Sequence, residues 1–167
     1  RFLLSNLYDF DPSKDAVDLA KFAPASLDAH ALDRAATIRR EVLAAYEAFD
    51  FRRAHLALFD FCNDTLSAFY CAAMKDRLYC DRADSPRRRA TQTVMHRVFD
   101  ALTRLLAPIL VYTADEAWEF AGKTRSVHLE ALPEADAELR DPMLEAHFDE
   151  VLKLRAVIAQ AVEPARQ

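Results

Sequence analysis

The sequence predicts an all-α fold, a bundle of four to five main helices with a small extended appendage. Gly122 is the only glycine among 167 residues, and 52% of the residues are hydrophobic. Alanine, leucine, arginine and glutamate are abundant and favour helix. The chain is long enough for one domain with a real core. Because phosphate-cradling loops need several glycines, a P-loop and a dinucleotide-binding βαβ unit are both excluded.

The first half of the chain carries two long patterns of apolar residues at helical spacing. Residues 1–8 are expected to be the last turns of a helix, and residues 9–27, which hold two prolines, a long connection. Residues 28–49 predict the first long helix. After a turn near Asp50, residues 54–74 predict the second.

Polar residues interrupt the second pattern at Asn63, Asp64 and Thr65, whose short side chains compete for backbone hydrogen bonds. A kink or a restart of the helix is expected there. The aromatic residues of this region lie at helical spacing and are expected in the core: Phe49, Phe51, Phe59, Phe61, Phe69 and Tyr70.

The second half predicts a loop over residues 77–85 and a helix over residues 86–107. Thr113 and Glu116 have the spacing of a capping box that starts a shorter helix. Gly122 is placed to end that helix as its C′ residue, and Trp118 is expected to pack in the bundle.

The end of the chain divides into two further segments. Residues 126–132 alternate and are expected to be extended, and Pro142 opens an amphipathic helix through about Val162. We therefore expect one domain over residues 1–167, with a bundle core at 1–125, an extended or loop segment at 126–141 and a C-terminal helix at 142–167. Since the chain begins without Met and with apolar residues already at helical spacing, it is expected to be a segment of a longer protein.

Catalytic and metal-binding patterns are not found. Cys62, Cys71 and Cys80 form no CxxC pair, so we expect reduced, mostly buried thiols in a cytoplasmic protein. The five histidines lack the ExxH pairs of di-iron bundles, and neither HExxH nor GxSxG occurs. No apolar run approaches the roughly 20 residues of a membrane span. We expect no catalytic site, metal or membrane contact in this segment, and a monomer.

The most unusual feature is a run of three arginines at a helix start. Ser85 is suited to the N-cap and Pro86 to the first helical position. Arg87, Arg88 and Arg89 then fill the first turn, where the helix dipole is already positive and each cation is unfavourable by roughly 0.3–1 kcal/mol.

Basic charge is concentrated around this run. Residues 75–104 hold eight basic and four acidic residues, a net of +4, whereas the rest of the chain holds 14 basic and 23 acidic residues, a net of −9. On the predicted helix, Arg89, Thr93, Arg97 and Arg104 lie on one face. The basic stripe from Arg87 to Arg104 is ~25 Å long at about 1.5 Å per residue. Such a stripe can follow a phosphate backbone. The alternative is a solvated face, with Asp81 or Asp84 pairing locally with the arginines.

Short motifs in a fixed order make the chain resemble the anticodon-binding helical domain of isoleucyl-tRNA synthetases, which are class I aminoacyl-tRNA synthetases. The resemblance covers about residues 1–130. The matching pieces are RFLLSNL (1–7) with FDP (10–12), AYE (45–47), FDF (49–51), FC (61–62), LSAFY (66–70), KDRLY (75–79), Ser85, RR (87–88), ATQT (90–93), LAPI (106–109), TADEAW (113–118) and SVHL (126–129).

The resemblance implies a module that holds the anticodon stem and loop of tRNA(Ile) and contacts the rest of the synthetase chain. The parent enzyme would use ATP and magnesium to join isoleucine to its tRNA, with zinc possible in a C-terminal part outside this chain. The HIGH and KMSKS signatures of that chemistry are absent here. Arg1 and Asn6 are included by analogy with the first helix of related bundles, and Tyr79 as a base-stacking candidate in a loop. The residues expected to contact tRNA are Arg1, Asn6, Lys75, Arg77, Tyr79, Arg87, Arg88, Arg89 and Arg97.

Two other functions fit the composition. One is a helical module that docks a protein partner through its acidic faces without binding RNA. The other is a small cofactor-binding bundle, which the missing ligand pairs disfavour.

Overall fold

The structure is a computed structural model that describes residues 1–18, 22–134 and 141–163. Every regular element within these ranges is helical, and no strand occurs in them. The predicted all-α class is therefore confirmed. Residues 135–140 and 164–167, which belong to the expected loop segment and C-terminal helix, lie outside the described residues. No helix in the described ranges is both long enough and apolar enough to cross a membrane.

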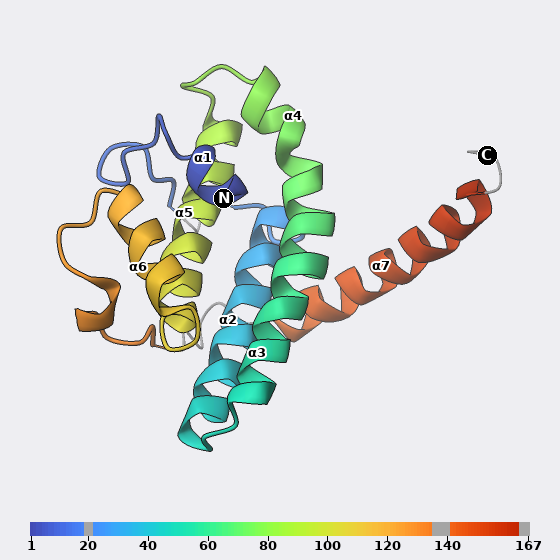
Figure 1. Ribbon diagram of the computed structural model, residues 1–167. Helices are drawn as coiled ribbons and strands as arrows, with labels where there is room; N and C mark the ends of the chain where they lie inside the picture. The colour runs from blue at the N-terminus through green and yellow to red at the C-terminus, as the bar shows by residue number, and fades with distance from the viewer. Residues whose placement is uncertain (19–21, 135–140, 164–167) are drawn as a thin grey trace.

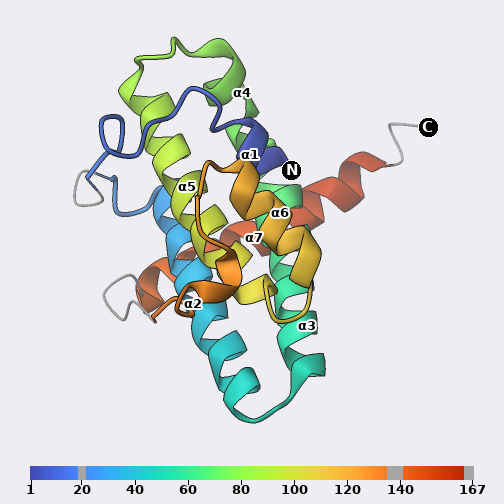
Figure 2. The same ribbon diagram turned by 60° about the vertical axis from the view of Figure 1, so that its left-hand side comes forward.

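Three long helical segments lie side by side and run alternately up and down (Figures 1 and 2). The middle segment is continuous but composite, because a π-helical stretch, η2, joins two α-helices. The segments are α2 (Leu27–Glu47), then α3 (Phe51–Asp60) with η2 (Phe61–Cys71) and α4 (Ala72–Cys80), then α5 (Pro86–Leu106).

The π-helical stretch keeps the composite helix facing the core. Its buried positions step by five residues from Phe61 to Leu66, and then by four to Tyr70. A turn closed by i→i+5 hydrogen bonds accommodates the extra residue and returns both side chains to the same side. The disturbance expected at residues 63–65 is thus an inserted run of wide turns, and the helix does not restart.

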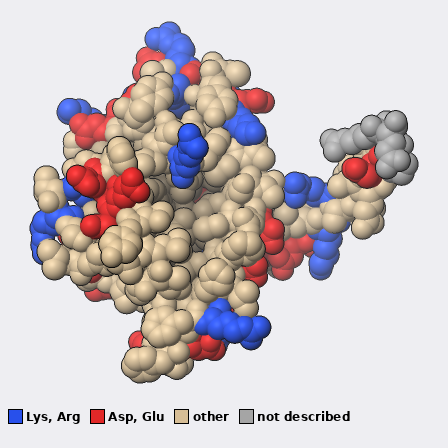
Figure 3. Space-filling model, viewed as in Figure 1, with Lys and Arg blue, Asp and Glu red and all other residues tan. Residues whose placement is uncertain are grey.

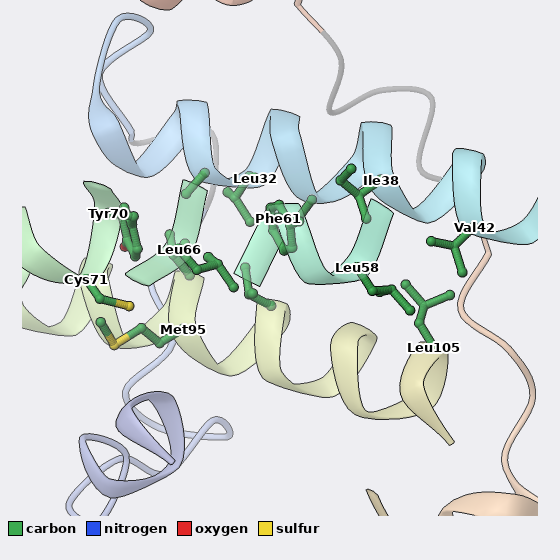
Figure 4. Close-up of a cluster of buried hydrophobic side chains, with 14 of the residues drawn as sticks. Leu32, Ile38, Val42, Leu58, Phe61, Leu66, Tyr70, Cys71, Met95 and Leu105 are labelled. Atoms are coloured by element: carbon green, nitrogen blue, oxygen red, sulfur yellow. The ribbon is translucent and has the colours of Figure 1, made fainter. Parts of the chain in front are cut away.

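The core lies between these three segments (Figure 4). Leu58 of α3 is 1% exposed and Val42 of α2 is fully buried. Full burial of such a side chain contributes roughly 1.5–3 kcal/mol. Val94, Met95 and Val98 supply the facing side of α5, as its predicted apolar stripe requires.

The aromatic residues divide between core and surface. Phe61 and Tyr70 are buried and Phe69 is half-buried. The prediction is wrong for the other three, because they lie on the turn between α2 and α3 or on the outer face of α3. Their exposures are Phe49 82%, Phe51 50% and Phe59 55%.

A shorter helix packs on the other side of α5. This helix, α6 (Val111–Phe120), buries Trp118. Its C-cap is Ala121, and the following Gly122, with a φ of 80°, holds the expected C′ position. The predicted capping box is wrong, because the N-cap is Leu110, three residues before Thr113, which lies inside the first turn of α6. The amide of Ala114 already donates to the carbonyl of Leu110 at 2.8 Å.

The segment after α6 is a tight turn. Residues 126–132 hold a 3₁₀ turn, η3 (Val127–Leu129), so the expected extended conformation is wrong for these three residues. Asp115 of α6 closes this turn, accepting from the Ser126 hydroxyl at 2.6 Å and from the Val127 amide at 3.0 Å.

The last helix, α7 (Pro142–Val162), begins against α2 and then projects from the bundle (Figure 1). Phe148 stacks on His30 with ring centroids 4.1 Å apart, and Glu145 pairs with Arg34 at 2.9 Å. Burial lowers the pKa of His30 to about 4. The neutral ring is therefore the form that packs beneath α7.

The three cysteines are free thiols, as expected. Cys71 is buried and Cys62 half-buried, and burial raises the pKa of both thiols, that of Cys71 to about 11. Cys80 is exposed at the end of α4, contrary to the expectation that the thiols are mostly buried.

Candidate nucleic-acid interface

The basic run lies where α4, the loop at residues 81–85 and the first turn of α5 meet, which we call the α4–α5 end. α4 continues to Cys80, so the loop predicted from residue 77 is shorter, and Tyr79 is helical. Ser85 holds the N-cap position and Pro86 the first helical position, as predicted. The Ser85 side chain does not cap the helix but donates to Asp81 Oδ2 at 3.4 Å.

The first arginine of the run forms a bidentate pair with the loop. Arg87 Nε donates to Asp81 Oδ2 at 2.8 Å and Nη2 to Oδ1 at 2.7 Å. The hydrogen bonds from Arg87 lower the pKa of the Asp81 carboxyl and raise that of the guanidinium. Arg87 is nevertheless 61% exposed in its side chain, while Asp81 is only 15% exposed.

The second and third arginines are held by the N-terminal segment. Arg88 Nη2 donates to Asp9 Oδ2 at 2.8 Å, and its side chain is 9% exposed. Arg89 Nη1 donates to the Asp9 carbonyl and to Gln92 Oε1, both at 2.8 Å. Gln92 is fully buried and donates to Asp9 Oδ1 at 2.7 Å. Asp9 thus ties residues 8–15 to the start of α5.

Electrostatics around Asp9 explain why arginines are tolerated at a helix N-terminus. Partial burial opposes ionisation of Asp9, but the Gln92 amide and the guanidinium groups of Arg88 and Arg89 outweigh it and lower the pKa of the carboxyl. The carboxylates of Asp9 and Asp81 therefore bring negative charge to the helix start that the dipole favours. The local pairing with Asp81, weighed as an alternative from the sequence, is present.

Arg77 belongs to a second internal network. Its Nη1 donates to Asp28 Oδ2 at 2.6 Å, and the Tyr70 hydroxyl donates to Asp28 Oδ1 at 2.7 Å. Asp28 is 5% exposed and Tyr70 is 1% exposed. Burial, followed by the neighbouring Asp28 carboxylate, raises the pKa of Tyr70 well above its usual value. This network joins α4 to the start of α2.

The arginine stripe expected along α5 is wrong, because the N-terminal connection covers it. The Val17 amide donates to Thr93 Oγ1 at 3.0 Å, and Thr93 is 3% exposed. Arg89 is 16% exposed in its side chain, and Arg104 pairs with Asp100. Of the residues assigned to the stripe, Arg87 and Arg97 are exposed.

The remaining predicted contact residues differ in exposure. Arg1, Lys75 and Tyr79 are exposed, Tyr79 by 64%. Asn6 is 8% exposed, and its side-chain amide donates to the Phe2 carbonyl at 2.9 Å. α1 (Phe2–Ser5), which carries Arg1 at its start, packs against α5 (Figure 1).

Sequence reasoning missed two contributors to this end. Asp9 lies 79 residues before Arg88 in the sequence. The one signal for such a partner was the run of arginines at a helix start, where positive charge is unfavourable unless an acidic residue lies nearby. Tyr8 is 79% exposed, and its hydroxyl accepts from Arg88 Nη2 at 3.4 Å. It places a second exposed aromatic ring next to the arginine run.

The α4–α5 end thus combines exposed cations and exposed aromatic rings with neighbouring arginines that are paired internally. Figure 3 shows basic and acidic side chains interspersed at this end, at the top of the view. Within the described part of the chain, neither Lys75 nor Arg97 has an ion-pair partner. Cations and aromatic faces are the two groups that bind the backbone and bases of unpaired RNA.

Comparison with known families decides the class. A family model described as the anticodon-binding domain of tRNA ligase matches residues 28–167, from the start of α2 onward. The chain belongs to this family. Its curated relatives include two proteins named isoleucine–tRNA ligase, one from Desulforudis audaxviator and one from Desulfitobacterium hafniense. The first is 41% identical over 171 residues and the second 43% identical over 170 residues.

Both alignments cover all of this chain but only 18% of each relative. The anticodon-binding domain thus spans about a fifth of the length of the curated relatives that it matches. The resemblance noted from the motifs is confirmed, and it extends through α7.

Proposed function

We propose that this chain binds the anticodon stem and loop of an isoleucine tRNA, as the anticodon-binding part of an isoleucine–tRNA ligase. The observation that carries the proposal is the 41–43% identity to proteins of that name along the whole chain, together with the match to the family model. The geometry of the α4–α5 end supports it.

Within that end, the exposed residues are proposed to make the contacts. Lys75 and Arg87 would bind backbone phosphates, which position the RNA but do not read its sequence. Tyr79 and Tyr8 present rings on which unpaired bases can stack. Arg97, further along α5, is exposed and would add a phosphate contact beyond this end.

The buried or paired members of the predicted set are proposed to act indirectly. RNA contact by Asn6, Arg77, Arg88 and Arg89 stays a prediction. The side chain of Asn6 closes α1 on the Phe2 carbonyl, Arg77 joins α4 to Asp28 of α2, and Arg88 and Arg89 join α5 to Asp9. Breaking a buried pair by removing one partner is unfavourable by about 3–5 kcal/mol. We therefore propose that they support the interface and that Arg1, at the exposed start of α1, is available to RNA.

Ligation of isoleucine with ATP and magnesium is proposed for the parent enzyme, outside this chain. Among the described residues, no group of three or more His, Cys, Asp or Glu side chains is placed to hold a metal ion. The single glycine is also too few for a phosphate-binding loop.

The proposal is tested by the affinity of the 167-residue chain for an RNA hairpin that carries the isoleucine anticodon, measured across salt concentrations. The variant Lys75→Ala/Arg87→Ala should weaken binding and reduce the salt slope by about one to two units. The control Arg40→Ala/Arg52→Ala removes two exposed arginines from α2 and α3. Its net charge change is the same.

Equal losses in the two variants would show that binding follows net charge alone and would contradict the assignment of the interface. Absence of binding by the wild-type chain at low salt would contradict RNA binding by this domain on its own. Binding of a protein partner that persists at high salt would favour the alternative of a protein-docking module.

A further inference from the structure

Within the run of three arginines, Arg87 alone has an exposed side chain, and its guanidinium nevertheless donates hydrogen bonds to a carboxylate. Nε and Nη2 bind both oxygens of Asp81, at 2.8 and 2.7 Å. This is the bidentate geometry that an arginine uses for carboxylate and phosphate alike. A backbone phosphate can therefore replace the carboxylate without a change in the way Arg87 donates.

Asp81 is held in place by groups other than Arg87. The Ser85 hydroxyl donates to Asp81 Oδ2 at 3.4 Å, and the Asp81 carbonyl accepts from Arg88 Nη1 at 3.3 Å. The positive charge of Arg77 also acts on the Asp81 carboxylate. If Arg87 turns away, the Asp81 carboxylate keeps a hydrogen-bond donor and a nearby cation.

The neighbouring arginines are not exchangeable in this way. Arg88 is 9% exposed and Arg89 16% exposed in their side chains, and both contact Asp9. Moving Arg88 toward solvent would remove a hydrogen bond from the Asp9 carboxylate, and moving Arg89 would remove the donor to the Asp9 carbonyl and to the side-chain oxygen of the buried Gln92. Among the three arginines, Arg87 alone combines an exposed side chain with a partner that other groups retain.

We propose that Asp81 occupies, in the free domain, the position that an RNA phosphate takes in the complex, so that Arg87 exchanges a carboxylate for a phosphate on binding. The proposal rests on the proposed function of RNA binding and names Asp81 as a residue that opposes it. Asp81 thereby weakens the binding of an isolated phosphate by Arg87. An RNA that also contacts Lys75 and Tyr79 binds tightly enough to displace the carboxylate. An unfavourable competitor of this kind is a common route to specificity.

The test compares Asp81→Asn with Asp76→Asn, each measured for binding of the anticodon hairpin at low salt. Asp76 is exposed on α4 and acts on Arg87 through its charge, without a hydrogen bond to it. Both variants remove one negative charge near the same guanidinium. Asp81→Asn should bind about two- to fivefold more tightly than wild type, as expected for the loss of an exposed ion pair, and Asp76→Asn should gain less.

Combination with Arg87→Ala locates the effect. In the Arg87→Ala background, the gain from Asp81→Asn should fall to the size of the smaller gain from Asp76→Asn, which reflects only the loss of a negative charge near the RNA. Equal gains in the two single variants, or a gain from Asp81→Asn that is undiminished by the loss of Arg87, would overturn the exchange while leaving RNA binding intact. A weaker affinity in Asp81→Asn would mean that Asp81 orients Arg87 for RNA, and would also overturn it.

The melting temperature of each variant separates these outcomes from loss of folding. Failure of wild type and both single variants to bind the hairpin would overturn the proposed function, and the exchange with it.

Discussion

Replacing Arg88 with methionine tests whether this arginine stabilises the fold or binds RNA. Methionine keeps the apolar stem of the side chain but removes the guanidinium, which donates to Asp9, Tyr8 and the Asp81 carbonyl. The Asp9 carboxylate would then keep Gln92 as a hydrogen-bond partner and Arg89 as a cation 3.8 Å away. The expected result is a large loss of stability.

The magnitude follows from burial. Arg88 and Asp9 are 9% and 20% exposed in their side chains, and removal of one partner from a buried pair is unfavourable by about 3–5 kcal/mol. Because Asp9 retains Gln92, we expect the lower end, about 3 kcal/mol. In a chain of this size, 1 kcal/mol shifts the melting temperature by roughly 2–4 °C, which gives a fall of about 6–12 °C.

Thermal unfolding followed by circular dichroism measures this shift. Arg87→Met is the matched control, since it removes the same group from the preceding position, where the side chain is 61% exposed, and should leave the melting temperature unchanged. If Arg88→Met melts with wild type but lowers RNA affinity as much as Arg87→Met does, Arg88 is a surface phosphate ligand and the reasoning is refuted.

Three further predictions concern the core, the pH dependence and the aromatic ring at the interface. Leu58→Ala, at a position 1% exposed, should lower the free energy of unfolding by about 2–5 kcal/mol in urea titrations; a loss below 1 kcal/mol would contradict the assigned core. Because the pKa of His30 is lowered to about 4 from about 6.5, the unfolded chain binds more protons between these values. The free energy of unfolding should therefore fall as the pH drops through this range. Urea titrations at several pH values should show a flatter dependence for His30→Leu, and identical pH profiles would contradict the burial of this ring. Tyr79→Ala should weaken binding of the anticodon hairpin by about 1–3 kcal/mol if a base stacks on the ring, whereas Tyr79→Phe should bind like wild type; equal losses in both would exclude stacking.

Local signals predicted the helices well. The Ser85–Pro86 pair placed the start of α5, and the apolar spacing of residues 28–49 predicted α2 closely. These features depend on neighbours in sequence, which a single chain displays directly. The capping box at Thr113 failed because the same residue pattern also fits inside a helix, and the backbone had already turned helical at Val111.

The contact partners of the arginines could not be predicted in the same way. Asp9 and Arg88 are 79 residues apart, and their pairing depends on how residues 8–15 pack across α5. Similarly, Asp28 meets Arg77 only because α2 and α4 lie together in the bundle. Charge counted along the sequence overstated the free positive charge of residues 75–104, since carboxylates from outside that segment neutralise part of it.

An NMR titration of the 167-residue chain with the anticodon hairpin tests the central claim most directly, because it reports which residues meet the RNA. The account predicts changes in the signals of Lys75, Tyr79 and the Arg87 side chain, with the buried Arg88 guanidinium unshifted or shifted far less. Changes concentrated on α7 or on the α2–α3 turn, with none at the α4–α5 end, would contradict it.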